Sequence, residues 1–175
     1  MKKPYLILID GPMGSGKSTV AQELHKRLHK KKGMNALISL DRLKRIVSGY
    51  KLGSSIHLRL SSYTGVAMSK EYLKEGIDVI VEKAFTTEEY INSFIEPLKR
   101  RARILVYQIE APEKIRLERV LKRDLHPEVK KRPPKSKFLR NSKHYSKSKY
   151  KKARVFDSSK LTPKEIVNRI IKDIK

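Results

Sequence analysis

Residues 5–24, YLILIDGPMGSGKSTVAQEL, limit the possible folds more than any other part of the chain. A near-continuous apolar run at residues 5–9 is typical of a strand that is buried on both faces. A loop with three glycines follows, and residues 17–31 then have apolar side chains at the spacing of one helical face. A strand, a glycine-rich loop and a helix in this order predict a phosphate-binding loop in an α/β protein.

The loop, GPMGSGKST, fits the pattern G-x-x-x-x-G-K-[ST] in full. Its glycines allow successive backbone N–H groups to converge on a polyphosphate, and the helix that follows adds the positive end of its dipole. We expect Lys17 to reach the β- and γ-phosphates of ATP and the Ser18 hydroxyl to bind Mg²⁺. The residues predicted to bind the nucleotide are Gly11, Met13, Gly14, Ser15, Gly16, Lys17, Ser18 and Thr19.

Four further predicted strands alternate with helices. The strands are 35–39, 77–82, 103–109 and 153–157, and the helices are 17–31, 41–47, 56–75, about 88–101, 112–123 and 163–174. Alternation of this kind predicts an α/β fold of the P-loop NTPase class, a five-stranded parallel sheet with helices on both faces. We expect one domain over residues 1–175, with ligands bound at the carboxyl ends of the strands.

Composition excludes several classes of site and location. The chain has no cysteine, which rules out disulfides and thiolate metal sites. No apolar run approaches the roughly 20 residues that span a bilayer, and the run at residues 5–9 is too short for a signal peptide. We therefore expect a cytoplasmic protein with no membrane partner.

The net charge of +24 is concentrated in one segment. Residues 130–154 hold twelve Lys or Arg and no Asp or Glu, which is half of the net charge. Pro127, Pro133 and Pro134 break regular structure there, so we expect a mobile basic lid insertion at about 124–150. A nucleic acid or another phosphate-rich substrate is the predicted partner of this segment. The alternative is a lid whose lysines only keep the protein soluble.

The chain resembles the small P-loop kinases, a group that includes polynucleotide kinases, zeta-toxins, adenylylsulfate kinases and chloramphenicol phosphotransferases. Residues 11–19 carry this resemblance most specifically, and it extends over essentially the whole chain. It implies a five-stranded core, a lid before the last strand, and ATP with Mg²⁺ as cofactors. The loop is specific for nucleotide binding and does not identify the phosphoryl acceptor.

Asp41 follows the second predicted strand, in SLDRLKR. A hydroxyl that attacks a γ-phosphate must lose a proton, and a carboxylate can accept it. In the resembled kinases an Asp at this place is the general base, and an Arg shortly after it contacts the substrate. The resemblance thus implies Asp41 as the base and either Arg42 or Arg45 as the substrate contact. The alternative for Asp41 is a helix cap.

Glu82 ends the third predicted strand, in VIVEKAF. A carboxylate there faces the predicted crevice, where it can hold Mg²⁺ through water or orient the acceptor. The alternative is an ordinary charged strand terminus. Asp10, just before the loop, is predicted to be structural or an outer contact of the magnesium ion.

Three arginines follow in IRLERVLKRD, at positions 116, 119 and 123. Their spacing places them on one helical face, and Leu121 is among the apolar residues predicted to be buried on the opposite face. In the resembled kinases, arginines at the base of the lid clamp phosphates or stack on adenine. Arg119 and Arg123 match these best, as cations that stabilise the transferring phosphoryl group.

The sequence therefore predicts an ATP- and Mg²⁺-dependent phosphotransferase that acts on a hydroxyl acceptor. A polynucleotide 5′-hydroxyl is the leading acceptor. A small-molecule kinase for nucleosides, sugars or an antibiotic-like alcohol stays open, as does a nucleoside monophosphate kinase. A different class, an ATP-binding and RNA-associated switch with little catalysis, also fits the sequence.

Overall fold

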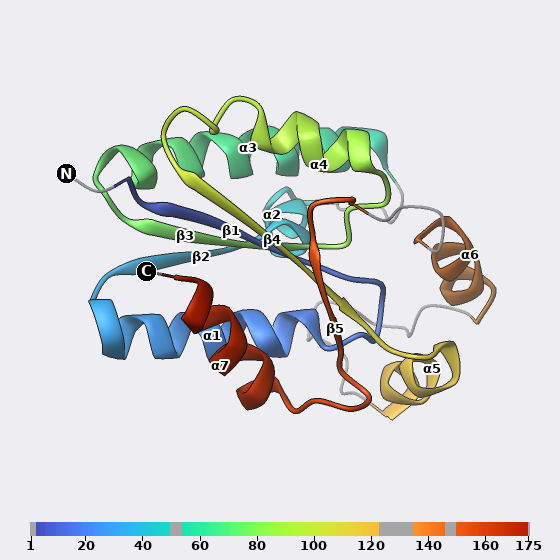
Figure 1. The fold of residues 1–175 in the computed structure, drawn as a ribbon. Helices are drawn as coiled ribbons and strands as arrows, with labels where there is room; N and C mark the ends of the chain where they lie inside the picture. The colour runs from blue at the N-terminus through green and yellow to red at the C-terminus, as the bar shows by residue number, and fades with distance from the viewer. Residues whose placement is uncertain (1–2, 50–53, 123–134, 146–149, 175) are drawn as a thin grey trace.

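The structure is a computed structural model that describes residues 3–49, 54–122, 135–145 and 150–174. Five parallel strands form one sheet in the order β2-β3-β1-β4-β5 (Figure 1). The strands are β1 (Tyr5–Asp10), β2 (Asn35–Ser39), β3 (Asp78–Lys83), β4 (Arg103–Glu110) and β5 (Arg154–Asp157). The predicted five-stranded parallel α/β fold is confirmed.

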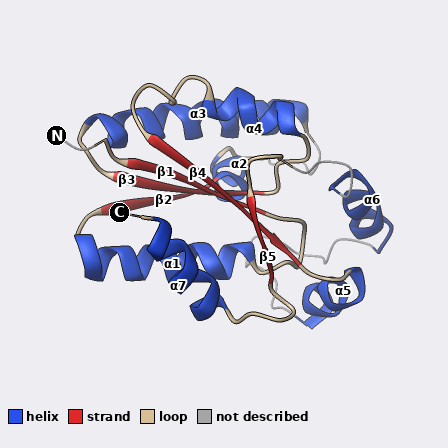
Figure 2. Ribbon diagram, in the orientation of Figure 1, coloured by secondary structure: helices blue, strands red, loops and turns tan. Residues whose placement is uncertain are grey.

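Helices cover both faces of this sheet (Figure 2). Helices α1 (Lys17–Lys32) and α7 (Pro163–Asp173) lie on one face, and α3 (Ser55–Lys74) and α4 (Glu88–Ile95) lie on the other. Helices α2 (Leu40–Ile46), α5 (Glu113–Lys122) and α6 (Lys135–Tyr145) lie toward the end of the sheet at which β1 runs into its glycine loop.

Strand β1 is central, so both of its faces are buried. Ile7 and Ile9 join the core cluster beneath α1 and α7, whereas Leu6 and Leu8 join the cluster beneath α3 and α4. Burial of these side chains on both faces favours the parallel sheet and explains why β1 reads as a continuous apolar run. The two cores hold the loop after β1 in a fixed position.

The last helix begins as its sequence predicts. The Thr162 hydroxyl accepts a hydrogen bond from the Glu165 backbone N–H, and the Glu165 carboxylate accepts one from the Thr162 backbone N–H. Pro163 follows the cap, where its missing N–H costs nothing. This capping box fixes the point at which the chain leaves β5 and turns back to cover the sheet.

Two predicted elements differ from the structure. Helix α4 ends at Ile95 and turns replace the predicted helix to residue 101, because Pro97 cannot continue the helical hydrogen bonds. Within the predicted mobile lid, residues 135–145 form helix α6. The rest of that predicted lid falls mainly on residues 123–134 and 146–149, outside the described residues.

In the described part of the chain, each helix is too short or too polar to cross a lipid bilayer.

Candidate active site at the carboxyl ends of the strands

Strand register brings polar residues from three strands to one edge of the sheet. Ser39 at the end of β2 is the register partner of Glu82, and Asp10 at the end of β1 is the register partner of Lys83. The loop after β1 and helix α2 after β2 begin at this same edge. Residues that are more than 40 positions apart in the sequence therefore share one site.

The loop after β1 has the features of an anion site. Gly14 has a φ of +81°, and a Cβ there would come within 2.4 Å of the Arg116 carbonyl oxygen, so glycine is required. Gly16 is the N-cap of helix α1 and provides no side-chain cap, and the first turn of the helix has no acidic residue. The buried Ser15 hydroxyl has no hydrogen-bond partner among the described residues. Free donors at a helix N-terminus fit the phosphates of ATP.

Ser18, Glu82 and Lys17 form a compact polar group beside the loop. The Ser18 hydroxyl donates to Glu82 Oε1 at 2.7 Å, and Lys17 Nζ lies 3.6 Å from the same oxygen. The Ser39 hydroxyl donates to the other oxygen, Oε2, at 2.8 Å. The described residues contain no group of three or more His, Cys, Asp or Glu that could hold a metal by themselves. A hydroxyl and one carboxylate fit Mg²⁺, which completes its shell with phosphates and water.

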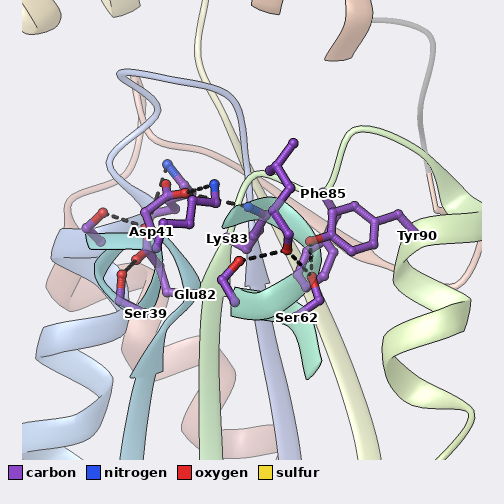
Figure 3. A network of polar contacts seen from close by, with 12 residues as sticks. Ser39, Asp41, Ser62, Glu82, Lys83, Phe85 and Tyr90 are labelled. Atoms are coloured by element: carbon purple, nitrogen blue, oxygen red, sulfur yellow. Dashed lines mark hydrogen bonds and ion pairs between the residues drawn. The ribbon is translucent and has the colours of Figure 1, made fainter. Parts of the chain in front are cut away.

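Asp41 lies at the start of α2 and faces two lysines (Figure 3). Lys44 Nζ lies 2.6 Å and Lys83 Nζ 3.6 Å from Asp41 Oδ1. Burial alone would raise the pKa of Asp41, but the ammonium groups of Lys83, Lys44 and Lys17 together hold this pKa well below its usual range. Asp41 is therefore an ionised carboxylate near the lysine of the phosphate loop.

The helix-cap alternative for Asp41 is wrong. Ser39 is the N-cap of α2, and Asp41 lies within the first turn. The side chain that α2 directs to Asp41 is Lys44, three residues later. Arg42 is exposed and Arg45 is half-buried, and neither is placed against Asp41 by a described contact. Sequence reasoning missed Lys44, although its spacing of three residues from Asp41 on a helix was the available signal.

The three arginines of the predicted stripe have different surroundings. Arg119 is exposed and donates to the Ser158 hydroxyl and carbonyl, both at 2.8 Å, and the Ser158 hydroxyl in turn donates to the Ser15 carbonyl. Arg116 is buried, contrary to the predicted exposed face, and Leu121 is exposed, contrary to the predicted buried face. The reason is that α5 packs through Arg116 and Val120. Arg123 lies outside the described residues.

Arg116 and Asp10 join the phosphate loop to helix α6. Arg116 donates to the Met13 carbonyl at 3.3 Å and to the Ser142 hydroxyl at 3.0 Å. Asp10 accepts a hydrogen bond from the Tyr145 hydroxyl at 2.7 Å. Asp10 is fully buried and also accepts from the Gly11 N–H, so its position is structural. Helix α6 thus contacts Arg116 of α5 and Asp10 at the end of β1, which in turn contact the loop.

Comparison with known proteins places this site in context. A family model described as an AAA domain matches residues 6–147. A search of curated protein sequences found no match. Among solved structures, a sugar kinase from Janibacter sp. HTCC2649 is 15% identical, with a TM-score of 0.71 over 97% of this chain and 93% of that one.

Two other solved structures share the fold. The APS kinase CysC of Mycobacterium tuberculosis, in complex with AMPPNP and APS, is 12% identical, with a TM-score of 0.70 over 98% of both chains. A chain of the Pnkp1/Rnl/Hen1 RNA repair complex is 20% identical, with a TM-score of 0.66 over 85% of this chain. Only 46% of that RNA-repair chain is covered, less than half of its length. At these identities the likeness concerns the fold.

Proposed function

The chain belongs to a family of AAA domains and has the fold of P-loop kinases, and we propose that it transfers the γ-phosphoryl group of ATP to a hydroxyl acceptor. The observation that carries the proposal is the position of Asp41. This ionised carboxylate lies close enough to Lys17 for the ammonium group to lower its pKa. A hydroxyl beside Asp41 is then beside the phosphate loop as well.

In the proposed reaction, the acceptor hydroxyl donates a hydrogen bond to Asp41 and attacks the γ-phosphorus. The bond from the γ-phosphorus to the bridging oxygen of ADP breaks, and the hydroxyl proton passes to Asp41 and then to water. Asp41 therefore both positions the hydroxyl and accepts its proton, and phosphoryl transfer passes through a loose transition state in which this proton leaves late. An aspartate of low pKa is suited to hold the hydroxyl in line.

The other residues of the site bind and stabilise. Lys17 and the loop N–H groups hold the phosphates, and Arg119 adds a cation at the entrance of the loop beside Ser158. Ser18 and Glu82 would hold Mg²⁺. The ion, when bound, neutralises charge on the β- and γ-phosphate oxygens. We propose residues 124–150 as the lid of a single domain.

A polynucleotide 5′-hydroxyl is the leading acceptor in this proposal. The first support is the density of Lys and Arg in residues 130–154. The second is that α6, within this segment, contacts Arg116 through Ser142 and Asp10 through Tyr145, next to the loop. A polyanion bound over the cations of α6 would lie close to the residues that flank the phosphate loop.

The test is a transfer assay with γ-labelled ATP. Short RNA, short DNA, nucleosides and nucleotides are offered side by side to the wild type and to Asp41→Asn, which keeps size and hydrogen bonding but accepts a proton poorly. We expect transfer by the wild type and a loss of about 10²–10⁴-fold in the variant. Glu71→Gln on the exposed face of α3 is the matched control, with an unchanged rate. Equal rates for Asp41→Asn and wild type would contradict the proposal.

A further inference from the structure

Ser158 is the first residue after β5, and it contacts two parts of the phosphate site. Its hydroxyl donates a hydrogen bond to the Ser15 carbonyl at 2.6 Å and accepts one from Arg119 Nη1 at 2.8 Å. Its backbone carbonyl accepts a second hydrogen bond from Arg119 Nη2, also at 2.8 Å. A single serine thus joins the phosphate loop to helix α5.

The sheet fixes the position of Ser158. Its backbone N–H donates to the carbonyl of Glu110, the last residue of β4, at 2.8 Å. The carbonyl of Asp157, the residue before it, accepts hydrogen bonds from the Lys160 and Leu161 backbone N–H groups at 3.2 and 3.0 Å. Because strand β4 and this turn hold the backbone on both sides, the Ser158 hydroxyl stays against the phosphate loop.

The hydrogen bond to Ser15 also orients a donor of the phosphate loop. A trans peptide is planar, so the Ser15 carbonyl and the Gly16 N–H point in opposite directions. With the carbonyl held by Ser158, the Gly16 N–H is directed away from Ser158. Gly16 is the N-cap of α1, so this N–H is one of the donors that have no acceptor within the helix and that suit an anion.

The same hydroxyl holds Arg119 beside the loop backbone. A Cβ on Gly16 would lie 3.9 Å from Ser158 Oγ and 4.0 Å from Arg119 Nη1. Arg119 is exposed, and a long exposed side chain has much rotamer freedom unless a contact restricts it. Its guanidinium carries five N–H donors, of which Ser158 takes two, so Arg119 can be held and still donate to a ligand.

We propose that Ser158 is a positioning residue, which through one hydroxyl fixes both the Gly16 N–H and the Arg119 guanidinium relative to the nucleotide phosphates. This role rests on the proposed function, in which Arg119 stabilises the transferring phosphoryl group. Donors that are already in place stabilise the developing charge without a cost of reorganisation. Without the hydroxyl, Arg119 loses one of its two bonds to Ser158, and the Ser15 peptide loses the bond that orients it.

The competing explanation is that Ser158 only ties the loop to the sheet and stabilises the fold. A double-mutant cycle separates the two explanations, because it measures whether Ser158 acts through Arg119. The variants are Ser158→Ala, Arg119→Met and the double variant, and the quantity measured is kcat/KM for ATP. Ser159→Ala is the matched control, since the Ser159 hydroxyl lies in the same turn but donates to the Asp157 carboxylate.

We expect Ser158→Ala to lower kcat/KM for ATP by about 10-fold, the effect of a lost hydrogen bond to a charged group. In the Arg119→Met background the same change should cost about 3-fold or less, because only the contribution through Ser15 remains. Ser159→Ala should keep the wild-type value. Equal fold-losses for Ser158→Ala in the two backgrounds, or equal losses in Ser158→Ala and Ser159→Ala, overturn the proposal.

A second pair of variants keeps the test valid if Ser158→Ala folds poorly. Ser158→Thr and Ser158→Val have nearly the same shape and differ in the hydroxyl. We expect kcat/KM for ATP to be about 10-fold higher in Ser158→Thr than in Ser158→Val, and this advantage should shrink in the Arg119→Met background. Equal values for the two variants overturn the proposal.

A binding measurement separates this proposal from the proposed function. A non-hydrolysable ATP analogue with Mg²⁺ is titrated by calorimetry into the wild type and the three variants of the cycle. If no acceptor receives phosphate, the proposed function fails, but losses of analogue affinity that are coupled between Ser158→Ala and Arg119→Met still support the positioning role. Losses that are independent in the double variant overturn it, whatever the result with acceptors.

Discussion

Asp10 is a single buried residue that connects four parts of the molecule. Its carboxylate accepts hydrogen bonds from the Gly11 and Phe85 backbone N–H groups, the Gln108 side-chain amide and the Tyr145 hydroxyl. Burial raises the pKa of Asp10, and the four donors only partly oppose this effect. The residue therefore makes the stability of the protein depend on pH.

We expect Asp10→Asn to remove this pH dependence. The folded-state pKa of Asp10 is raised above 3.8, so the folded protein binds more protons than the unfolded chain just above that pH. The stabilisation from this proton is complete below about pH 4 and is lost as the pH rises through the folded-state pKa. The unfolding free energy of the wild type, measured with urea, should thus fall relative to that of Asp10→Asn as the pH rises from about 4. A difference that is constant with pH would contradict this assignment.

A second prediction at the residue scale concerns Glu82. The carboxylate touches the Ser18 and Ser39 hydroxyls and lies near Lys17, so it orients the group that would bind Mg²⁺. Glu82→Gln removes the charge and keeps the size. We expect the Mg²⁺ concentration for half-maximal transfer to rise by about 10–100-fold, as for other outer contacts of metal sites. The exposed Glu71→Gln serves as the control, and an unchanged Mg²⁺ requirement in Glu82→Gln would remove Glu82 from the metal site.

The sequence predicted some residues of the candidate site and missed others. The loop residues were predictable because their pattern is contiguous and each position has a local physical reason. Lys44 and Lys83 were not, because their meeting depends on the pairing of Ser39 with Glu82 across β2 and β3. A lysine next to a strand end does not indicate a site residue until the neighbouring strand is known.

At the scale of elements, α6 is the largest difference from expectation. The density of lysine and the prolines before it predicted a mobile segment, whereas Phe138, Ser142 and Tyr145 are buried at a spacing of four and three residues. A stripe of three residues is too short to be recognised by its period. This stripe packs against the buried Arg116, whose guanidinium carbon Cζ lies 5.2 Å from the centre of the Phe138 ring.

This contact predicts that Arg116 positions the phosphate loop. The guanidinium donates to the Ala111 and Met13 carbonyls and to Ser142, which one lysine ammonium cannot reproduce. We expect Arg116→Lys to raise the KM for ATP by about 10-fold with a smaller effect on kcat. Arg101→Lys, at an exposed position just before β4 and so at the opposite end of the strands from the loop, is the matched control. If the KM for ATP is the same in Arg116→Lys and wild type, α6 packs without influencing the loop.

At the scale of the whole molecule, alternation of strands and helices predicted the parallel sheet but not the order β2-β3-β1-β4-β5. The order depends on the side to which each crossover returns, and local periodicity carries no information on that choice. The order matters here because it places β3, with Glu82 and Lys83, between β1 and β2. The site consequently has the phosphate loop on one side and Asp41 on the other.

The uneven charge of the molecule leads to the last prediction, which concerns the partner of residues 130–154. Twelve cations without an acidic residue repel one another, and a polynucleotide that occupies several of them releases counterions from its phosphates. We expect micromolar or tighter binding of single-stranded RNA or DNA at low salt. The logarithm of affinity should fall with the logarithm of salt concentration at a slope of roughly 0.7 per phosphate contacted.

Two sets of five substitutions to glutamine separate a local site from general charge. The test set neutralises Lys130, Lys131, Arg132, Lys135 and Lys137, of which the first three lie outside the described residues. The control set neutralises cations before β2 and before β4, at the opposite end of the strands: Lys30, Lys31, Lys99, Arg100 and Arg101. Both sets lower the net charge equally, so only a local site distinguishes them.

Titration of a labelled oligonucleotide at several salt concentrations should show weaker binding and a flatter slope for the test set alone. Equal losses in the two sets would mean that net charge attracts the oligonucleotide, and no binding at low salt would favour a small acceptor and a lid whose lysines serve solubility.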